Sequence, residues 1–425
     1  MRVRLRPIVL LSFALVTTMF CTAPQTAGQS ATGAAAPSTL NAPGKAQVEA
    51  QSGLELARQG TALASPNPCV GAVVLDASGN VDEGFHTYAG VKHAEILALE
   101  AAGEKARGGT LYLNLEPCFH QGRTGPCVDA VLKAGIKRVV IAMRDPNPLV
   151  CGKSVEKLRG AGVEIVEGLL EQEARKLNEA FAKYIRTKLP LVTLKAGMTL
   201  DGKIAPPPGE SAYPSALGVG GASGGWITSV EARAHVQELR HASDAILVGV
   251  GTIVADDPLL TDRTGLERRR SLLRVVLDSR LRLPLESRLV KTAGQDVIVF
   301  CSFAEEKKKQ QLEERGIGVV QVPLGAVGDG RPDLSKVLEH LGAVEITSII
   351  IEGGAMVNWA ALVAGVVDKV FLYYAPKILA GTGSVPFAGG KGFRRISEAA
   401  HVKNISLHRF GEDFAVEGYI RDPYL

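Results

Sequence analysis

His93-Ala94-Glu95 and the later stretch Pro117-Cys118-Phe119-His120-Gln121-Gly122-Arg123-Thr124-Gly125-Pro126-Cys127 are the most informative parts of this 425-residue chain. One imidazole and two thiolates are ligands that Zn²⁺ prefers, and a set of three leaves a fourth position open for water. A glutamate beside that position can move protons. We therefore predict a zinc site on His93, Cys118 and Cys127, with Glu95 as the catalytic acid and base.

Each of these residues also has a simpler interpretation. Cys118 and Cys127 could form a local disulfide or be two buried thiols, and Glu95 could be an acid that satisfies a helix start. The cysteines are spread thinly over a long chain, unlike the dense framework of a small disulfide-rich domain. They are Cys21, Cys69, Cys118, Cys127, Cys151 and Cys301. The presence of His93 and Glu95 favours the metal.

Length and composition predict an ordinary globular protein with two domains. The hydrophobic content is 46% and the charged content 22%, which leaves ample apolar material for two cores. Residues 1–48 hold four of the 48 basic residues and no acid, so the remainder has 44 basic against 44 acidic residues. A neutral body gives no electrostatic case for nucleic acid, and local arginines must hold any anionic substrate.

Residues 1–48 read as a leader. A basic start, Met1–Arg6, precedes the 13-residue and mostly apolar run Ile8–Phe20, which is too short to span a membrane. The pattern fits a signal peptide or a plastid transit peptide, and a true start farther downstream is the remaining interpretation. Cys21 suggests a lipoprotein site, but Met19-Phe20 before it lacks the small residues that such a site needs. We expect a disordered leader that adds nothing to catalysis, no membrane association in the mature form, and a cytoplasmic enzyme; plastid or export is the alternative.

Residues 49–188 alternate between helical and strand patterns. This alternation predicts a sheet flanked by helices. The expected helices are 50–63, 93–102, 127–134 and 154–161, and the expected strands are 69–75, 81–85, 110–115, 139–143 and 163–166. His93 and Glu95 then fall in the first turn of one helix and Cys127 begins another, where free N–H groups favour a thiolate.

Eight residues separate Cys118 from Cys127, whereas many nucleic-acid and nucleoside deaminases have two between their cysteines. The insert His120–Thr124, Pro66-Asn67-Pro68 and Asp145–Pro148 make this half similar to the deaminase half of the bifunctional riboflavin-biosynthesis deaminase/reductase family. The resemblance implies a cytidine-deaminase-like α/β/α fold, and it implies that Asn67 and His120 line the substrate pocket. Asn67 also fits an ordinary turn. Phe119 and Cys69 depart from the family pattern, which has serine and asparagine there.

Leu189-Pro190 marks the join to the second half, residues 189–425. Three segments resemble the reductase half of the same family, which implies an α/β domain like dihydrofolate reductase. They are Lys195–Lys203, Ala255–Arg263 and Ser348–Gly354. The strand, the two glycines and the helix start of the last segment can bind an anion through backbone N–H groups, or can simply make a tight turn. The absence of a G-x-G-x-x-G stretch argues against a Rossmann domain.

The resemblance assigns residues to the substrate and to NADPH. The implied substrate residues are Lys195, Arg240, Leu260, Arg263 and Glu352. The implied cofactor residues are Met198, Trp226, Thr228, Thr252, Asp256, Ser279, Gly353 and Gly354. In this assignment the two arginines take the 5′-phosphate, Glu352 holds ribityl hydroxyls, and Lys195 and Asp256 lie near the reduced sugar carbon. Trp226 as core, Arg240 as a helix end and Asp256 as a turn former are the simpler alternatives.

Two further segments are not explained by the resemblance. Gly209-Glu210-Ser211 is followed by 14 residues, 212–225, before Trp226, where the family has one. We interpret them as a flexible inserted loop near the active site, and either Ser211 or Ser223 takes the substrate-contacting role. The run Glu267-Arg268-Arg269-Arg270 is interpreted as a solvated loop.

The resemblance implies two consecutive reactions on a small-molecule phosphoribosyl pyrimidine. The first is zinc-dependent deamination, and the second is NADPH-dependent reduction of the ribosyl group to ribityl. We also expect a homo-oligomer. One alternative is a single-activity zinc deaminase with a degenerate C-terminal half. A second is a non-catalytic exported or nucleic-acid-binding protein that keeps only the fold.

Overall fold

The structure is a computed structural model that describes residues 43–88, 91–119, 125–148, 150–207, 225–325 and 330–425. The expected leader up to residue 42, His120, Ser211 and Ser223 lie outside the described residues. So does the inserted segment 212–225, except for its last residue. In the described ranges, we find no helix with the length and apolar character needed to cross a membrane.

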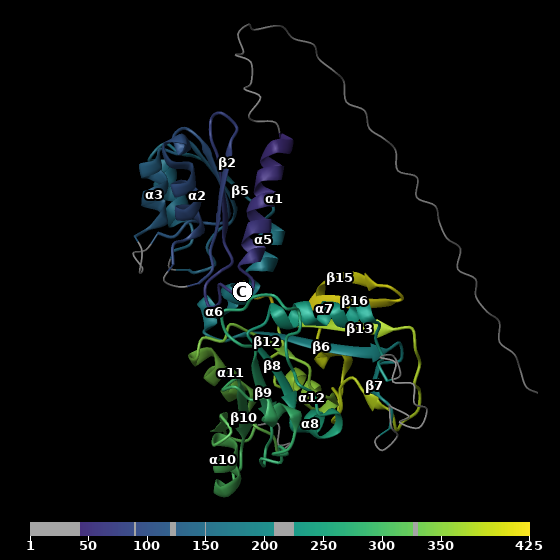
Figure 1. The fold of residues 1–425 in the computed structure, drawn as a ribbon. Helices are drawn as coiled ribbons and strands as arrows, with labels where there is room; N and C mark the ends of the chain where they lie inside the picture. Colours follow the sequence, from purple (N-terminus) through teal and green to yellow (C-terminus); the bar gives the residue numbers. More distant parts are fainter. Residues whose placement is uncertain (1–42, 89–90, 120–124, 149, 208–224, 326–329) are drawn as a thin grey trace, which may run out of the picture. The chain divides into compact units, whose positions relative to one another are not determined.

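The first half of the chain forms a five-stranded sheet with the strand order β2-β1-β3-β4-β5 (Figure 1). Strand β1 pairs antiparallel with β2 and β3, whereas β3, β4 and β5 run parallel. The strands are β1 Gly71–Leu75, β2 Val81–Phe85, β3 Thr110–Leu115, β4 Arg138–Met143 and β5 Glu164–Glu167.

Helices cover both faces of this sheet, with α2 and α3 on one side and α1 on the other (Figure 1). Alternate side chains of β1 face the two layers: Val73 packs with Ala46 and Ala50 of α1, and Val74 lies in one cluster with Ala98 of α2. The helical elements are α1 Pro43–Gln59, α2 Ala94–Ala102, η2 Gly103–Ala106, α3 Cys127–Ala134, α4 Lys153–Gly160, α5 Glu171–Leu177 and α6 Glu179–Thr187.

Two helix starts differ from the prediction. Helix α1 begins at Pro43, inside the segment assigned to a disordered leader. His93 does not lie in the first turn of α2 but is its N-cap residue, with an extended backbone at φ −72° and ψ 160°. Its carbonyl already accepts the N–H groups of Ile96 and Leu97, which is how an N-cap residue begins a helix. The imidazole is therefore presented from an extended residue next to Glu95.

The second half forms a nine-stranded sheet with the order β11-β10-β9-β8-β12-β6-β13-β16-β15. The pairs from β11 through β13 are parallel, and β16 and β15 add an antiparallel edge. The strands are β6 Leu191–Thr199, β8 Ala245–Gly249, β9 Leu273–Leu277, β10 Val297–Cys301, β11 Ile317–Gln321, β12 Ser348–Ile351, β13 Lys369–Ala375, β15 Lys403–Phe410 and β16 Asp413–Tyr419. A separate two-stranded sheet pairs β7 Lys203–Ala205 with β14 Val385–Pro386.

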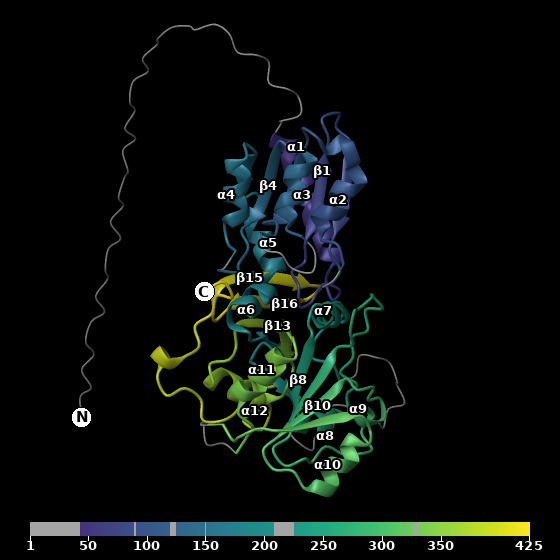
Figure 2. The same ribbon diagram turned by 90° about the vertical axis from the view of Figure 1, so that its left-hand side faces the viewer.

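Helices also cover both faces of the nine-stranded sheet (Figure 2). Leu247 of β8 shares one core with α11 and α12, and its neighbour Ile246 shares another with α8 and α9. Helix α7 packs over Phe371 and Tyr373 of β13. The helical elements are α7 Val230–His241, α8 Val250–Asp256, α9 Arg288–Lys291, α10 Glu306–Glu313, α11 Leu334–Ala343, α12 Ala355–Val363 and η4 Ile396–Glu398.

This sheet order places several predicted site residues together. The adjacent parallel strands β9, β8, β12 and β6 point the same way, and ligands of open α/β sheets bind outside the carboxyl ends of such strands. Ser279 follows β9, Thr252 follows β8 and Glu352 follows β12. Lys195 lies one residue beyond Leu194, the register partner of Ile351 at the end of β12.

Candidate active sites

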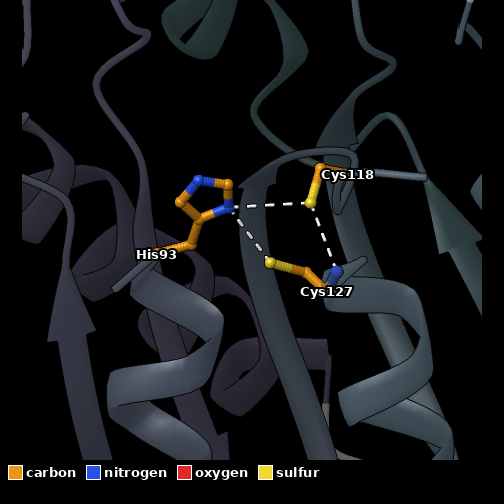
Figure 3. A group of neighbouring side chains, drawn as sticks. All are labelled: His93, Cys118 and Cys127. Atoms are coloured by element: carbon orange, nitrogen blue, oxygen red, sulfur yellow. Dashed lines mark hydrogen bonds between the residues drawn. The ribbon is translucent and has the colours of Figure 1, made fainter. Parts of the chain in front are cut away.

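The ring of His93 and the sulfurs of Cys118 and Cys127 converge (Figure 3). The Nδ1 atom of His93 lies 3.1 Å from Sγ of Cys127 and 3.6 Å from Sγ of Cys118. All three candidate ligand atoms lie within 4.8 Å of one another. The fold thus brings His93 to two cysteines that lie 25 and 34 positions later in the sequence.

This geometry fits a zinc ion. Ligand atoms bound at about 2.0–2.3 Å from tetrahedral zinc lie roughly 3.5–3.8 Å from one another. The separations of 3.1 and 3.6 Å are close to that range, and two sulfurs with one imidazole nitrogen are a typical donor set of a catalytic site. The cysteines are free thiols, so the disulfide interpretation is wrong.

The start of α3 favours a thiolate at this point. Cys127 is the first residue of α3 after Pro126, and its backbone N–H donates to Sγ of Cys118 at 3.2 Å. Hydrogen bonds from the Cys127 thiol, from His93 and from this N–H lower the pKa of Cys118 to about 4, although burial opposes the shift. A deprotonated sulfur is the form that binds metal.

Glu95 lies one residue inside α2 and is 3% exposed. Burial raises the pKa of its carboxyl group to about 7, against the opposing influence of the His93 charge. An isolated helix-start acid would face solvent, whereas this carboxyl group is enclosed beside the His93 and cysteine side chains. The arrangement therefore supports the predicted proton-transfer position more than the simpler alternative.

In the second half, Glu352 links two of the predicted substrate residues. Its Oε1 accepts from Nε of Arg240 at 2.6 Å, and its Oε2 accepts from Nη2 of Arg240 at 3.1 Å and from Nζ of Lys195 at 3.3 Å. Burial alone would raise the pKa of Glu352, but the two cations lower it to about 2. The carboxylate is therefore held charged directly after the carboxyl end of β12, where Lys195 reaches it from the middle of β6.

Arg240 and Arg263 have different environments, although the prediction gave them the same role. The guanidinium of Arg240 is 12% exposed and also donates to the carbonyl of Thr261. Arg263 is exposed, and its backbone N–H donates to the side chain of Gln237. Among the described residues, we find no acceptor for its guanidinium group. The charge of Arg240 contributes, after burial, to lowering the pKa of Arg263, so the Arg240 charge acts on Arg263. Leu260 is buried, with φ at 56°.

The turn from β12 into α12 explains one of its glycines structurally. A Cβ atom on Gly353 would lie 3.1 Å from both the nitrogen of Gly249 and Cα of Val248, so the close approach of β8 favours glycine there. Gly354 caps α12, and its N–H lies 3.5 Å from Oγ1 of Thr252. The N-terminus of α12 and Thr252 thus adjoin, and a helix N-terminus can bind an anion through its backbone N–H groups.

The other residues assigned to the cofactor occupy varied positions. Met198 is buried on β6. Trp226 is 49% exposed with Arg233 over its ring at 4.8 Å, so the alternative of Trp226 as core is wrong. Thr228 lies against Gly197, where an added Cβ would approach its methyl carbon to 3.2 Å. Ser279 accepts the N–H groups of Ser302 and Phe303 through its carbonyl. Asp256 is exposed at the last position of α8.

Comparison with known proteins assigns each half separately. Residues 47–143 match the model for the cytidine and deoxycytidylate deaminase zinc-binding region, and residues 190–416 match the RibD C-terminal domain. Riboflavin biosynthesis protein RibD of Actinobacillus pleuropneumoniae is 40% identical over 371 residues, which cover 87% of this chain and 94% of that protein. The RibD of Aquifex aeolicus is 41% identical over 85% of this chain and 95% of its own length. The chain belongs to the RibD family of riboflavin biosynthesis proteins.

Solved structures of the RibD family support the same fold along the chain. RibD of Acinetobacter baumannii is 34% identical and matches with a TM-score of 0.73, covering 88% of this chain and 98% of that chain. The deaminase/reductase of Thermotoga maritima is 36% identical, with a TM-score of 0.71 and the same coverage. The predicted α/β fold with a deaminase half and a reductase half is confirmed.

Membership of the RibD family decides between the interpretations of the sequence. Both the deaminase and the reductase domain are present, so the chain is a bifunctional riboflavin-biosynthesis enzyme, not a single-activity deaminase. Zinc for the deaminase and NADPH for the reductase are accordingly its cofactors. The non-catalytic alternative is not supported.

Glu116 adjoins the RibD zinc site and was missed by the sequence analysis. Its buried carboxylate accepts the N–H groups of Asp145 and Gly152 at 3.1 and 2.9 Å and that of Ser154 at 3.1 Å. Glu116 directly precedes Pro117-Cys118, so it anchors one ligand to the loop before α4. The only sequence signal was an acid at the end of an apolar strand.

His86 is a second residue that the sequence analysis missed. Its Nε2 lies 3.0 Å from Nδ2 of Asn67, its Nδ1 lies 3.3 Å from the carbonyl of Lys92, and its ring meets the His93 ring edge-on at 5.1 Å. Burial lowers the pKa of His86. A neutral ring that donates to Lys92 and accepts from Asn67 satisfies all three groups. Asn67 is therefore oriented by His86, whose ring meets that of the zinc ligand His93, and its role toward substrate stays a prediction.

The two departures from the family pattern lie outside the set of zinc ligands. Phe119 is exposed, and Nζ of Lys157 lies 5.6 Å from its ring centre. Cys69 has its backbone held by the amides of Asn114 and Asn178, and burial raises the pKa of its thiol to about 12. Neither side chain joins the three zinc ligands.

Proposed function

We propose that the chain catalyses two successive steps on one phosphoribosyl pyrimidine. In the first, the deaminase half replaces the 2-amino group of 2,5-diamino-6-(5-phosphoribosylamino)pyrimidin-4-one by oxygen and releases ammonia. In the second, the reductase half converts the ribosyl group of the deaminated product to ribityl. The deaminase/reductase of Thermotoga maritima, whose name states these activities, supports the proposal through its likeness over 88% of this chain.

In the deaminase step, we assign His93, Cys118 and Cys127 to the metal and Glu95 to proton transfer. A bound zinc ion would make water at its fourth position acidic enough to act as a nucleophile. Glu95 would move the protons of the reaction, from the attacking water to the ring nitrogen and to the departing amine. Asn67, oriented by His86, and His120 are assigned to the pyrimidine and ribose.

In the reductase step, NADPH supplies the hydride for the sugar carbon, and the protein orients both reactants. We assign Glu352 to the sugar hydroxyls, because its charged oxygens can accept O–H donors while Lys195 and Arg240 hold them in place. Arg263, whose guanidinium donors are free among the described residues, is assigned to the 5′-phosphate beside Arg240. Leu260 lines this end of the site.

The cofactor residues are assigned along the carboxyl ends of β6, β8, β9 and β12. Gly354 and Thr252 adjoin at the start of α12, which suits a phosphate of NADPH. Gly353 permits the close turn. The remaining assignments stay predictions from the sequence: Met198, Trp226, Thr228, Asp256 and Ser279.

The convergence of His93, Cys118 and Cys127 beside Glu95 is the observation that carries the proposal. Its test is Glu95→Gln in the full-length enzyme, with Glu100→Gln on the solvent side of α2 as the matched control. We expect Glu95→Gln to retain zinc and to lose deamination by about 10³-fold. Reduction of supplied deaminated substrate should be unchanged. Equal loss of both activities, or ammonia release at the control rate, would contradict the assignment.

Three broader predictions remain proposals. We propose functional boundaries at residues 49–188 for the deaminase and 189–425 for the reductase, supported by a separate sheet and separate apolar cores in each half. A cytoplasmic location and a homo-oligomeric state rest on the sequence resemblance. Cell fractionation and light scattering of the purified protein test these two directly.

A further inference from the structure

The run Glu267-Arg268-Arg269-Arg270 behaves differently from the solvated loop that its charge predicts. Glu267 and Arg269 are exposed, but the side chain of Arg268 is only 13% exposed. Its guanidinium makes five hydrogen bonds, four of them to backbone carbonyls. A solvated arginine would donate its hydrogen bonds to water, so the contacts of Arg268 indicate a structural role.

Arg268 holds the carboxyl end of α7. Its Nη1 donates to the carbonyls of Arg240 and His241 at 3.2 and 2.7 Å, and its Nη2 donates to that of Ser243 at 2.7 Å. The last carbonyls of a helix have no partner within the helix, and a cation there also favours the helix dipole. Arg268 therefore binds the backbone of Arg240, and the side chain of Arg240 donates hydrogen bonds to Glu352.

Arg268 also holds the segment that follows Leu260. Its Nη1 lies 3.0 Å from Oδ2 of Asp262, and the same oxygen lies 2.9 Å from Nδ1 of His241. Burial would raise the pKa of Asp262, but hydrogen bonds from Thr264, His241 and Arg268 lower it to about 2. Asp262 directly precedes Arg263. One guanidinium therefore binds the backbone at and after Arg240 and the side chain of the residue before Arg263, the two arginines assigned to the phosphate.

We propose that Arg268 is a positioning residue of the reductase that sets the spacing between Arg240 and Arg263 and so its preference for a 5′-phosphorylated substrate. The inference rests on the proposed assignment of these two arginines to the phosphate. Arg268 does not itself touch substrate in this account, because its donors are used on the protein. Lysine cannot replace it, since an ammonium group has three donors and no planar fork to reach carbonyls and a carboxylate at once.

The test compares two substrates of the reductase, 5-amino-6-(5-phosphoribosylamino)uracil and the same compound without its phosphate. The ratio of their kcat/KM values measures recognition of the phosphate alone. In Arg268→Ala we expect this ratio to fall by ~10- to 100-fold, through a higher KM for the phosphorylated compound, because small displacements of binding groups are costly. The kcat, the KM for NADPH and zinc-dependent ammonia release should stay within about twofold of the wild type.

The matched control is Arg315→Ala. Arg315 also donates to a carbonyl, that of Gln311 in the last turns of α10, but α10 carries no residue of the site. Its substrate ratio should equal that of the wild type. Arg268→Lys should resemble Arg268→Ala. If the alanine variant does not fold, Asp262→Asn keeps the side-chain shape, removes the charge that Arg268 contacts, and should lower the same ratio.

Three outcomes separate the possibilities. A wild-type enzyme that does not distinguish the two compounds overturns the phosphate assignment and this inference with it. A wild-type preference that Arg268→Ala or Asp262→Asn retains overturns the inference and leaves the phosphate assignment standing. Equal losses on both compounds would mean that Arg268 only stabilises the fold, which also contradicts the proposal. A selective loss on the phosphorylated compound in both variants is the supporting result.

Discussion

The zinc site and the reductase site are assembled in different ways. The zinc ligands come from a span of 35 residues, His93 to Cys127, and two of them lie at helix starts. The reductase residues come from Lys195 to Gly354 and meet only because β6, β12, β8 and β9 are neighbours in one parallel sheet. The first site depends on local chain geometry and a metal, and the second on sheet order and a buried ion cluster. Damage to one should therefore leave the other intact.

The largest expected effect is at the zinc site. Cys118→Ser replaces a thiolate by a poor zinc ligand, so we expect metal content near zero and a loss of deamination of about 10³-fold or more. Reductase turnover on supplied deaminated substrate should be unchanged. Metal analysis and the two assays on one sample measure this. Cys151→Ser is the control, because Cys151 is an exposed free thiol. Full zinc binding by the Cys118 variant would show that Cys118 is not a zinc ligand.

The second effect is at the ion cluster of the reductase. Glu352→Gln leaves Lys195 and Arg240 buried without their shared carboxylate, and we expect reductase kcat/KM to fall by roughly 10²-fold. Zinc content and ammonia release should match the wild type. The exposed Glu345→Gln is the control. Unchanged reductase kinetics in the Glu352 variant would place Glu352 outside the pocket.

A smaller effect is expected from the residue that supports a zinc ligand. Glu116→Gln keeps the size but weakens the acceptors for the N–H groups of Asp145, Gly152 and Ser154. We expect zinc affinity to fall by ~10- to 100-fold, as for other residues that support metal ligands. Competition with a zinc chelator measures it. Wild-type affinity would show that Cys118 is positioned without Glu116.

The smallest effect is expected at the edge of the deaminase pocket. Asn67→Ala removes the partner of His86 Nε2 and should raise the deaminase KM by about tenfold or less, with kcat and zinc content nearly unchanged. Steady-state ammonia release measures both constants. A large fall in kcat at constant KM would instead show that Asn67 takes part in the chemical step.

The comparison also explains what could be predicted from the sequence. His93, Glu95, Cys118 and Cys127 stood out because few other functions require these residue types at such spacing. The position of His93 at the N-cap could not be predicted, because the apolar pattern of the sequence is the same for an N-cap residue and for a residue of the first turn. Only the backbone angles distinguish the two. Glu116 and His86 lack any periodic or compositional signal. Their roles arise from neighbours that fold against them from elsewhere in the chain.

In the reductase half, single residues were harder to interpret than strands. The apolar run before Glu352 predicted the strand observed as β12. Helix α8 was not predicted, because Val250–Asp256 is short and contains glycine and β-branched residues that disfavour helices. A Cβ atom on Gly353 would crowd β8, which supports the tight-turn interpretation of this glycine, and its part in cofactor binding stays a prediction. Arg268 looked solvated, because charge alone does not show which carbonyls a guanidinium will meet.

X-ray absorption at the zinc edge of the purified, full-length enzyme tests the central claim most directly. The account predicts one zinc per chain, bound by two sulfurs at about 2.3 Å and by two lighter atoms at about 2.0–2.1 Å, one of them an imidazole nitrogen. Cys118→Ser should abolish that signal, and Glu95→Gln should leave both sulfurs in place. A zinc shell without sulfur, or with four sulfurs, would contradict the site on His93, Cys118 and Cys127.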